Sequence, residues 1–362
     1  MEQKTSRRAY IMNGTFIRTF LGANSASGFA SLYDAFTEEH RTLVIKGGPG
    51  SGKSGIMKKI AAEAGKRGLF VEYCHCSSDA DSLDGILIPE KDLCVVDGTP
   101  PHVSEPKFPG AKDELIYTGQ FWDSEKLRDS LEEIRDLSGK IRGCFGRAYR
   151  YLAAAGKAAE EIRSTTNKLT DHKKIQAFAT DLTERNTKNL HKKGTVHPRF
   201  LSGIAPQGLI VNRDTVYTLA EKIYVLNDPY RIGQSFLDAA IESALVRGQT
   251  VYVFYDPLCP SIPEHIALPD AGIGFVTSNK VHPFEAQNAY QIHLSRFSEI
   301  DKTAKEYCRN AEKLLDSCTK EAIQSLQREK AYHDDLEEYY VEAMDFKKLN
   351  SYTEKIIRRI FA

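Results

Sequence analysis

The sequence predicts an α/β protein made of two tandem units, each with a mostly parallel sheet flanked by helices and each carrying a long helical hairpin. Three observations support this prediction. A glycine-rich loop joins an apolar strand to a helix, the chain matches itself at an offset of 180 residues, and each half runs into a long polar segment with apolar residues at roughly heptad spacing. The chain of 362 residues is long enough for two domains with ordinary cores.

The glycine-rich loop matches G-x-x-x-x-G-K-[ST], the Walker A pattern of nucleotide-binding proteins. Its residues are Gly47, Gly48, Pro49, Gly50, Ser51, Gly52, Lys53 and Ser54. Successive backbone N–H groups and the start of the following helix would form a nest for phosphate oxygens. Lys53 is expected to reach the β- and γ-phosphates, and the Ser54 hydroxyl to bind Mg²⁺. A glycine-rich turn with an incidental Lys is the alternative, but the strand before and the helix after favour nucleotide binding.

A second acid is expected to support the metal. The apolar strand 93–96 ends at Asp97 and has the form of a Walker B strand, in which the acid accepts hydrogen bonds from Mg²⁺-bound water. An ordinary buried strand that ends in an Asp-Gly turn is the alternative. Gly98 stands where ATPases of the AAA and RecA type usually place a water-activating Glu, so Glu72 or His75, near the end of the second strand, is the candidate to orient a nucleophile.

Three further features surround these motifs. His102 lies in a proline-stiffened loop, at a place where P-loop proteins often sense the γ-phosphate, although a structural histidine is the alternative. Cys74, His75 and Cys76 invite a zinc interpretation, but adjacent residues on a strand point to opposite faces, so we do not expect zinc. The aspartate-rich segment 77–84 is expected to form a polar rim over the site.

The internal repeat sets the expected domain boundary. Residues 86–97 align without gaps on 266–277, and His102 falls on His282. Near the end of each half, 171–175 resembles 345–349. We therefore predict one unit at 1–195 and a second at 196–362.

The second unit is expected to have a degenerate nucleotide site. Gln234 stands for the lysine of the loop, bulky side chains replace two of its glycines, and Thr277 stands for Asp97. Without the lysine and the glycines an anion nest should be weak, so this unit is expected to be a structural or regulatory pseudo-copy.

Bulk composition limits the choice of partners. Lys plus Arg and Asp plus Glu both number 49, so the net charge of zero gives no clear signal for nucleic acid or for a membrane surface. No apolar run approaches 18 residues, and the polar N-terminus is not followed by an apolar segment. The seven scattered cysteines, without a C-x-x-C pair, are typical of reduced thiols, and we expect a cytoplasmic protein.

The whole chain resembles a family of uncharacterised bacterial proteins with two tandem P-loop NTPase domains, usually named as ATPases. The resemblance rests on the loop Gly47 to Ser54, on 75–79 with 82–85, and on 97–99 with His102. It implies two tandem P-loop NTPase-like units and no particular substrate.

The motifs together predict Mg²⁺-dependent binding and hydrolysis of ATP or GTP by the first unit, with an unknown protein or small molecule as partner. A phosphotransferase of the nucleoside- or nucleotide-kinase type is one alternative, with the aspartate-rich segment holding the acceptor. A nucleotide-dependent interaction switch with negligible turnover is the other.

Overall fold

The computed structural model describes residues 15–38, 40–101, 103–280, 282–286 and 288–362. His102, expected to contact the nucleotide, therefore lies outside the described residues.

The first sheet contains six strands in the order β1-β5-β6-β7-β4-β8. They are β1 (Phe16–Phe20), β4 (Arg41–Lys46), β5 (Val71–His75), β6 (Leu83–Ile88), β7 (Leu93–Asp97) and β8 (Glu114–Tyr117). Five of them run in the same direction, and β6 is antiparallel to both neighbours. The sheet is therefore mixed. The sequence does not predict β6, whose connection to β7 is the single turn η1 (Pro89–Lys91), too short for a parallel crossover.

The second sheet repeats this topology in the order β16-β12-β15-β14-β13-β9. Its strands are β9 (Thr195–Arg199), β12 (Lys222–Asn227), β13 (Thr250–Tyr255), β14 (Pro263–Leu268), β15 (Ile273–Ser278) and β16 (Tyr290–His293). Here β14 is the antiparallel strand. The same order and orientation in both sheets agree with the internal repeat.

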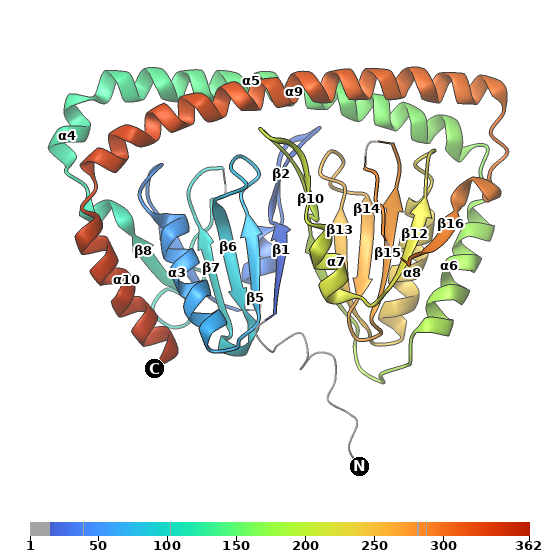
Figure 1. Ribbon diagram of the computed structural model, residues 1–362, viewed down its shortest axis with the longest axis horizontal. Coiled ribbons are helices and arrows are strands. Elements are labelled where there is room, and N and C mark those ends of the chain that lie inside the picture. The colour runs from blue at the N-terminus through green and yellow to red at the C-terminus, as the bar shows by residue number, and fades with distance from the viewer. Residues whose placement is uncertain (1–14, 39, 102, 281, 287) are drawn as a thin grey trace, which may run out of the picture.

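Each six-stranded sheet, together with its neighbouring helices and one two-stranded hairpin, forms what we call a lobe. The first lobe has β2 (Gly22–Ser25), β3 (Gly28–Ser31), α2 (Tyr33–Thr37), α3 (Lys53–Lys66) and η2 (Thr118–Phe121). The second has β10 (Ser202–Ala205), β11 (Gly208–Val211), α7 (Arg213–Leu219), α8 (Gln234–Val246) and η3 (Leu294–Phe297). The lobes lie side by side (Figure 1), and equivalent residues join them, because Phe20 and Phe200 exchange backbone hydrogen bonds of 2.9 and 3.0 Å.

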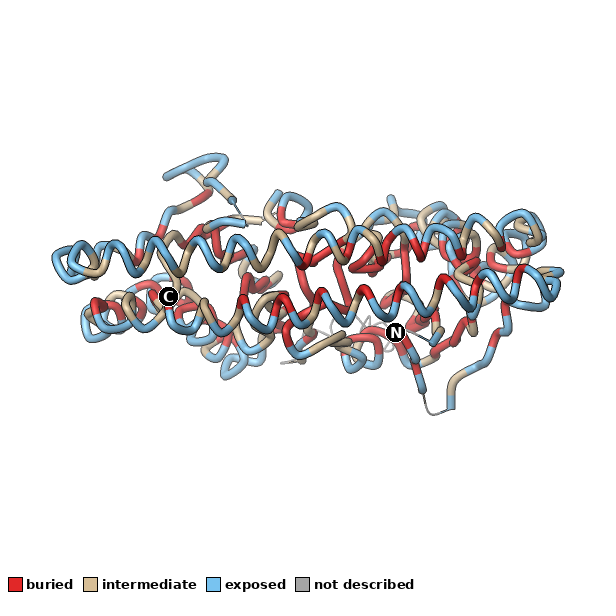
Figure 2. The backbone as a smooth tube through the Cα atoms, turned by 90° about the horizontal axis from the view of Figure 1, so that it is seen from above, coloured by how far each residue is buried: buried red, intermediate tan, exposed pale blue. Residues whose placement is uncertain are grey.

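The long helices differ from the expectation of a hairpin inside each half. They are α4 (Ser124–Asp129), α5 (Leu131–Asn167), α6 (His172–Asn186), α9 (Lys302–Ala343) and α10 (Phe346–Phe361). Helices α5 and α9 lie against each other in opposite directions and cross both lobes (Figures 1 and 2). Leu152 and Ala155 of α5 share one buried cluster with Leu315 and Ala322 of α9. A heptad-like apolar stripe packs against any matching stripe, so the spacing predicts a helix pair without saying which helices form it.

The two shorter helices are exchanged between the halves as a result. Helix α6 follows α5 and packs on α8, so that Ile175 and Ala179 lie in the core of the second lobe. Helix α10 follows α9 and packs on α3, so that Leu349 and Ile356 lie in the core of the first. The two lobes in space therefore do not coincide with the sequence halves 1–195 and 196–362.

Candidate functional site

The glycine-rich loop, Gly47 to Ser54, connects the end of β4 to the start of α3. Gly50 and Gly52 have φ values of +63° and +83°, in the left-handed region that glycine adopts without a steric cost. A Cβ at Gly47 would lie 1.9 Å from Thr118 Oγ1, so this position also excludes a side chain. The sequence pattern thus coincides with a backbone that needs glycine at three points.

Lys53 and Asp97 lie together beside this loop. Strands β4 and β7 pair in parallel, with Ile45 opposite Asp97. Lys53 Nζ donates hydrogen bonds to the carbonyl oxygens of Gly47 (3.0 Å) and Gly48 (2.7 Å), and lies 3.6 Å from Asp97 Oδ2. Asp97 Oδ1 accepts hydrogen bonds from the N–H and the hydroxyl of Thr99. The acid predicted to support the metal is therefore held next to the predicted phosphate-binding lysine.

Ser54 stands at the junction between the loop and the aspartate-rich segment 77–84. Its Oγ accepts a hydrogen bond of 3.0 Å from the N–H of Leu83, which leaves a second lone pair for a cation. One turn further along α3, Lys58 Nζ donates to the carbonyl of Asp81 at 2.6 Å. The segment thus borders the start of α3.

Glu72 does not belong to this group. Its carboxylate is fully buried and accepts hydrogen bonds from Arg199 Nε (2.6 Å) and Nη2 (3.1 Å) and from the Thr19 hydroxyl (2.8 Å). Arg199 comes from β9 of the second lobe, so the pair ties the two lobes together. The prediction that Glu72 orients a nucleophile is corrected, because both of its oxygens are engaged away from the loop.

His75 also lies apart from the loop strand, since β6 and β7 separate β5 from β4. Its Nδ1 lies 2.7 Å from the carbonyl of Ala80 and therefore carries the proton, while Nε2 is buried without a hydrogen-bond partner among the described residues. Burial lowers the pKa of His75, which favours the neutral ring. The structure gives His75 an unused acceptor but not a position at the phosphate loop.

Helix α9 approaches the glycine-rich loop from the other half of the chain. Glu337 Oε1 accepts a hydrogen bond of 3.1 Å from the N–H of Gly50. A Cβ at Gly50 would lie 2.8 Å from Val341 Cγ2, and one at Gly48 would lie 2.9 Å from the Tyr340 ring. The loop glycines therefore permit the close approach of α9. Neither spacing nor motif indicates this contact in the sequence, because 287 residues separate its partners.

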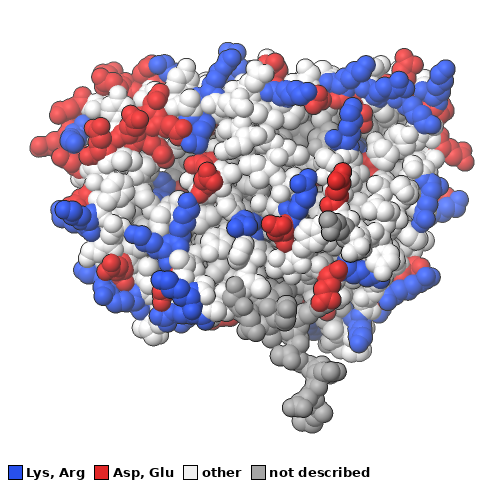
Figure 3. All heavy atoms as spheres, viewed as in Figure 1, with Lys and Arg blue, Asp and Glu red and all other residues white. Residues whose placement is uncertain are grey.

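His333, Asp334 and Glu337 of α9 place possible ligand atoms within 4.8 Å of one another and form one of two candidate metal-binding groups in the described chain. Burial lowers the pKa of His333 and so favours a neutral ring. On the surface, Asp and Glu side chains gather at the upper left, over the α4 corner and the end of α9 (Figure 3).

The corresponding loop of the second lobe is closed by its own acid. Asp228 is 4 % exposed, and its carboxylate accepts hydrogen bonds from the N–H groups of Ile232 (2.9 Å) and Gly233 (2.7 Å). Burial raises the pKa of Asp228, while these hydrogen bonds act in the opposite direction. The amide groups that would receive a phosphate in this loop already hold a carboxylate.

Helix α5 lies over that second loop as α9 lies over the first. Thr166 Oγ1 is 3.0 Å from the carbonyl oxygen of Tyr230. Arg163, eight residues before the helix-capping Asp171, lines a small cavity with Asp228 and Asp256. Glu337 stands eight residues before the matching cap, Asp345. Helix α5 therefore places a basic residue, Arg163, near the loop that contains Asp228. Helix α9 places an acidic residue, Glu337, against the loop that contains Lys53.

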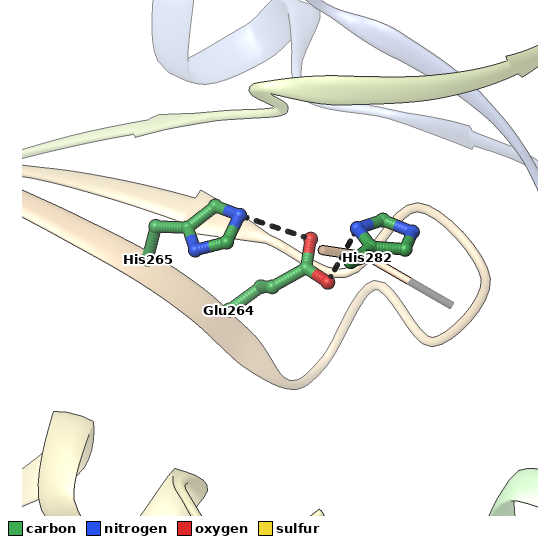
Figure 4. A group of neighbouring side chains, drawn as sticks. All are labelled: Glu264, His265 and His282. Carbon is green, nitrogen blue, oxygen red and sulfur yellow. Dashed lines mark ion pairs between the residues drawn. The ribbon is translucent and has the colours of Figure 1, made fainter. Parts of the chain in front are cut away.

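The second candidate metal group is Glu264, His265 and His282, all buried in the second lobe (Figure 4). Glu264 lies between the two rings, with Oε1 2.8 Å from His282 Nδ1 and Oε2 3.5 Å from His265 Nε2. Burial by itself would raise the pKa of Glu264, but the two histidines outweigh burial and lower it to about 2. Burial would lower the pKa of His282, but Glu264 raises it, which favours an ion pair.

The hydrogen bonding of His265 argues against metal ligation in this group. Its Nδ1 accepts a hydrogen bond of 3.1 Å from the N–H of Thr277, so the neutral ring must carry its proton on Nε2, the atom that faces Glu264. A metal-binding histidine instead donates from the nitrogen that does not bind the metal. We therefore interpret the three residues as a buried ion-pair cluster of the second lobe.

Comparisons with protein-family models, curated protein sequences and solved structures gave no match. In the described part of the chain, no helix combines the length and the apolar character needed to cross a membrane.

Proposed function

We propose that the first lobe binds Mg·ATP or Mg·GTP at the glycine-rich loop and hydrolyses it, and that the second lobe is a pseudo-copy without catalytic activity. The observation that carries the proposal is the meeting of three groups: the Gly50 N–H, which donates to a carboxylate, Lys53, and Asp97 3.6 Å from Lys53. This loop already holds one anion, the Glu337 carboxylate, which supports its capacity for phosphate.

Each group has a defined task in the proposed site. The loop N–H groups and Lys53 would bind the phosphate oxygens, and Ser54 Oγ and Asp97 would hold a Mg²⁺, which would supply positive charge beside the β- and γ-phosphates. In hydrolysis, water attacks the γ-phosphorus, the bond to the β–γ bridging oxygen breaks, and the nucleoside diphosphate and phosphate leave. Lys53 must exchange its two loop carbonyl partners for phosphate oxygens during binding.

The second lobe lacks these requirements. Gln234 offers no charge at the position of the lysine, and Asp228 occupies the amide groups of its loop. A nucleotide phosphate would have to displace a buried carboxylate of the same charge sign. This contrast supports one nucleotide site per chain.

The contact of α9 with the loop favours a second candidate function, a nucleotide-dependent switch with negligible turnover. Helix α9 also packs on α5 and crosses both lobes, so a ligand that moves its end changes a surface shared by the whole molecule. The kinase alternative keeps only the position of the aspartate-rich segment beside Ser54 as support.

Steady-state phosphate release with Mg²⁺ and ATP or GTP tests the proposal. Replacing Lys53 with Ala is expected to reduce turnover at least about a hundredfold, because it removes a charged donor to the phosphates. Gln234→Ala, at the corresponding position of the second lobe, is the matched control and should leave turnover unchanged. Turnover that Lys53→Ala does not alter would remove the loop from the mechanism. Tight binding without release of phosphate would favour the switch.

A further inference from the structure

The side chain of Glu337 occupies the position that the proposed function assigns to a phosphate. Its Oε1 lies 3.1 Å from the Gly50 nitrogen, in the middle of the loop. A carboxylate and a phosphate oxygen are both anionic acceptors for such a donor, and both gain from the helix start that follows. Lys53 is likewise engaged, with the carbonyls of Gly47 and Gly48. The loop is therefore closed by groups of the chain itself.

The two lobes differ in how firmly that internal anion is held. In the second lobe, Asp228 belongs to the loop that it closes, is nearly fully buried, and makes two backbone hydrogen bonds. In the first lobe, Glu337 comes from a separate helix, its side chain is 40 % exposed, and it makes one hydrogen bond to the loop. Glu337 is thus the internal anion that can leave without unfolding the loop.

The charge of the α9 end acts in the same direction as Glu337. The last eleven residues of α9, 333–343, include five Asp or Glu residues and no Lys or Arg. This segment lies against a loop that attracts anions, and like charges separated by less than about 10 Å repel each other appreciably at ordinary salt. A triphosphate that enters the loop would meet this acidic segment at short range.

We propose that Glu337 is an autoinhibitory competitor of the nucleotide. Binding of Mg·ATP displaces its carboxylate from Gly50 and moves the end of α9 away from the loop. The proposal rests on the proposed nucleotide function of the loop and adds the regulation of that site. Helix α9 begins over the second lobe, so its movement would transmit nucleotide binding in the first lobe to the second.

Equilibrium binding of Mg·ATP to the full chain, measured by isothermal titration, tests the competition. Glu337→Gln keeps the shape of the side chain but removes its charge, and should lower the Kd about tenfold, which corresponds to one charge-assisted contact. Glu338→Gln removes one charge from an exposed neighbour on the same helix and is the matched control, with an expected change of less than about twofold. The double variant Lys53→Ala/Glu337→Gln should not show the lower Kd for Mg·ATP that Glu337→Gln shows.

The single tryptophan of the chain reports the displacement. Trp122 packs on Tyr340 of α9, with ring centroids 5.5 Å apart. Mg·ATP is expected to shift its emission to longer wavelength with the same midpoint as binding, since the indole loses this neighbour and gains water. Glu337→Gln should show part of that shift without nucleotide, which a direct contact between nucleotide and indole cannot produce.

The outcomes separate this inference from the proposed function. Equal Kd values for the wild type and Glu337→Gln would overturn the competition but leave nucleotide binding in place. A fall in kcat with unchanged Kd would also overturn it and make Glu337 a catalytic residue. If Mg·ATP and Mg·GTP bind to neither protein, the proposed function fails, and the inference fails with it. A lower Kd with unchanged Trp122 emission would limit the role of Glu337 to charge and overturn the movement of α9.

Discussion

At the scale of single residues, the two similar loops differ in the charged groups that contact them: Lys53 with Glu337 in the first lobe, and Asp228 in the second. The proximity of Lys53 to Asp97 could be predicted from the sequence, because the loop pattern and the strand that ends in an acid are local features with a fixed geometric consequence, whereas their roles at a nucleotide stay a prediction. Glu337 could not, since no local pattern links it to Gly50. The role expected of Glu72 failed for the same reason: its partner, Arg199, lies 127 residues away, on the other lobe.

Glu329 of α9 provides a test of how the helix is held. It is 1 % exposed, and its Oε2 has no hydrogen-bond partner among the described residues. Burial raises its pKa to about 7, with Lys330 lowering it and Asp334 raising it further. A carboxyl group whose folded pKa is raised contributes its full stability below its unfolded pKa of 4.5, and loses that contribution as the pH rises through about 7.

Replacing Glu329 with Gln should therefore remove a pH dependence. At about pH 8 the variant is expected to be more stable by on the order of 3 kcal/mol, and at about pH 4 the two proteins should be nearly equal. Urea denaturation across this range, with the exposed Glu338→Gln as control, measures the difference. A wild type whose stability does not fall between these pH values would show that the carboxylate is solvated or paired.

At the scale of elements, the sequence predicts whether a segment is a helix or a strand better than it predicts which other element that segment packs against. The strands around the loop follow from apolar runs bounded by glycine and aspartate, and the caps of α6 and α10 follow from Asp171 and Asp345. The antiparallel β6 and the exchange of α6 and α10 do not follow. Their positions depend on which buried surface each helix covers at the end of a long connection.

Because α10 packs on the first lobe, a mutation in α10 is expected to destabilise that lobe. Ile356→Ala removes a 2 % exposed side chain from the core of the first lobe and should cost roughly 2–5 kcal/mol. Hydrogen exchange should show lost protection in α3 and little change in α8. Lys355→Ala, an exposed neighbour, should change stability by less than about 0.5 kcal/mol. Equal loss in α3 and α8 would mean that the lobes open together.

At the scale of the whole molecule, the sequence repeat predicts two similar lobes but not their dependence on each other. Each lobe takes its outer helix from the opposite half, α5 and α9 bridge both, and Glu72 with Arg199 forms a buried ion pair between them. A repeat in sequence has therefore become one interlocked body.

Cutting the chain between 195 and 196 tests this interdependence. Expressed alone, 1–195 would lack α10, and 196–362 would lack α6, so each fragment would expose an apolar face and should fail to fold. Expressed together, they should copurify as a one-to-one complex with the thermal stability and Mg·ATP binding of the uncut chain. A fragment 1–195 that folds alone as a stable monomer would contradict the role assigned to α10.

The exchanged helices also determine the order in which the protein can be completed during synthesis. More than two hundred residues separate the end of β8 from the start of α10. At typical ribosomal speeds, on the order of ten to fifty seconds pass between synthesis of β8 and synthesis of α10. During that time the face of α3 that α10 covers stays exposed. The second lobe receives α6 before its own strands are made. The lobe that carries the glycine-rich loop is translated first and finished last, so a truncated chain cannot assemble its complete site.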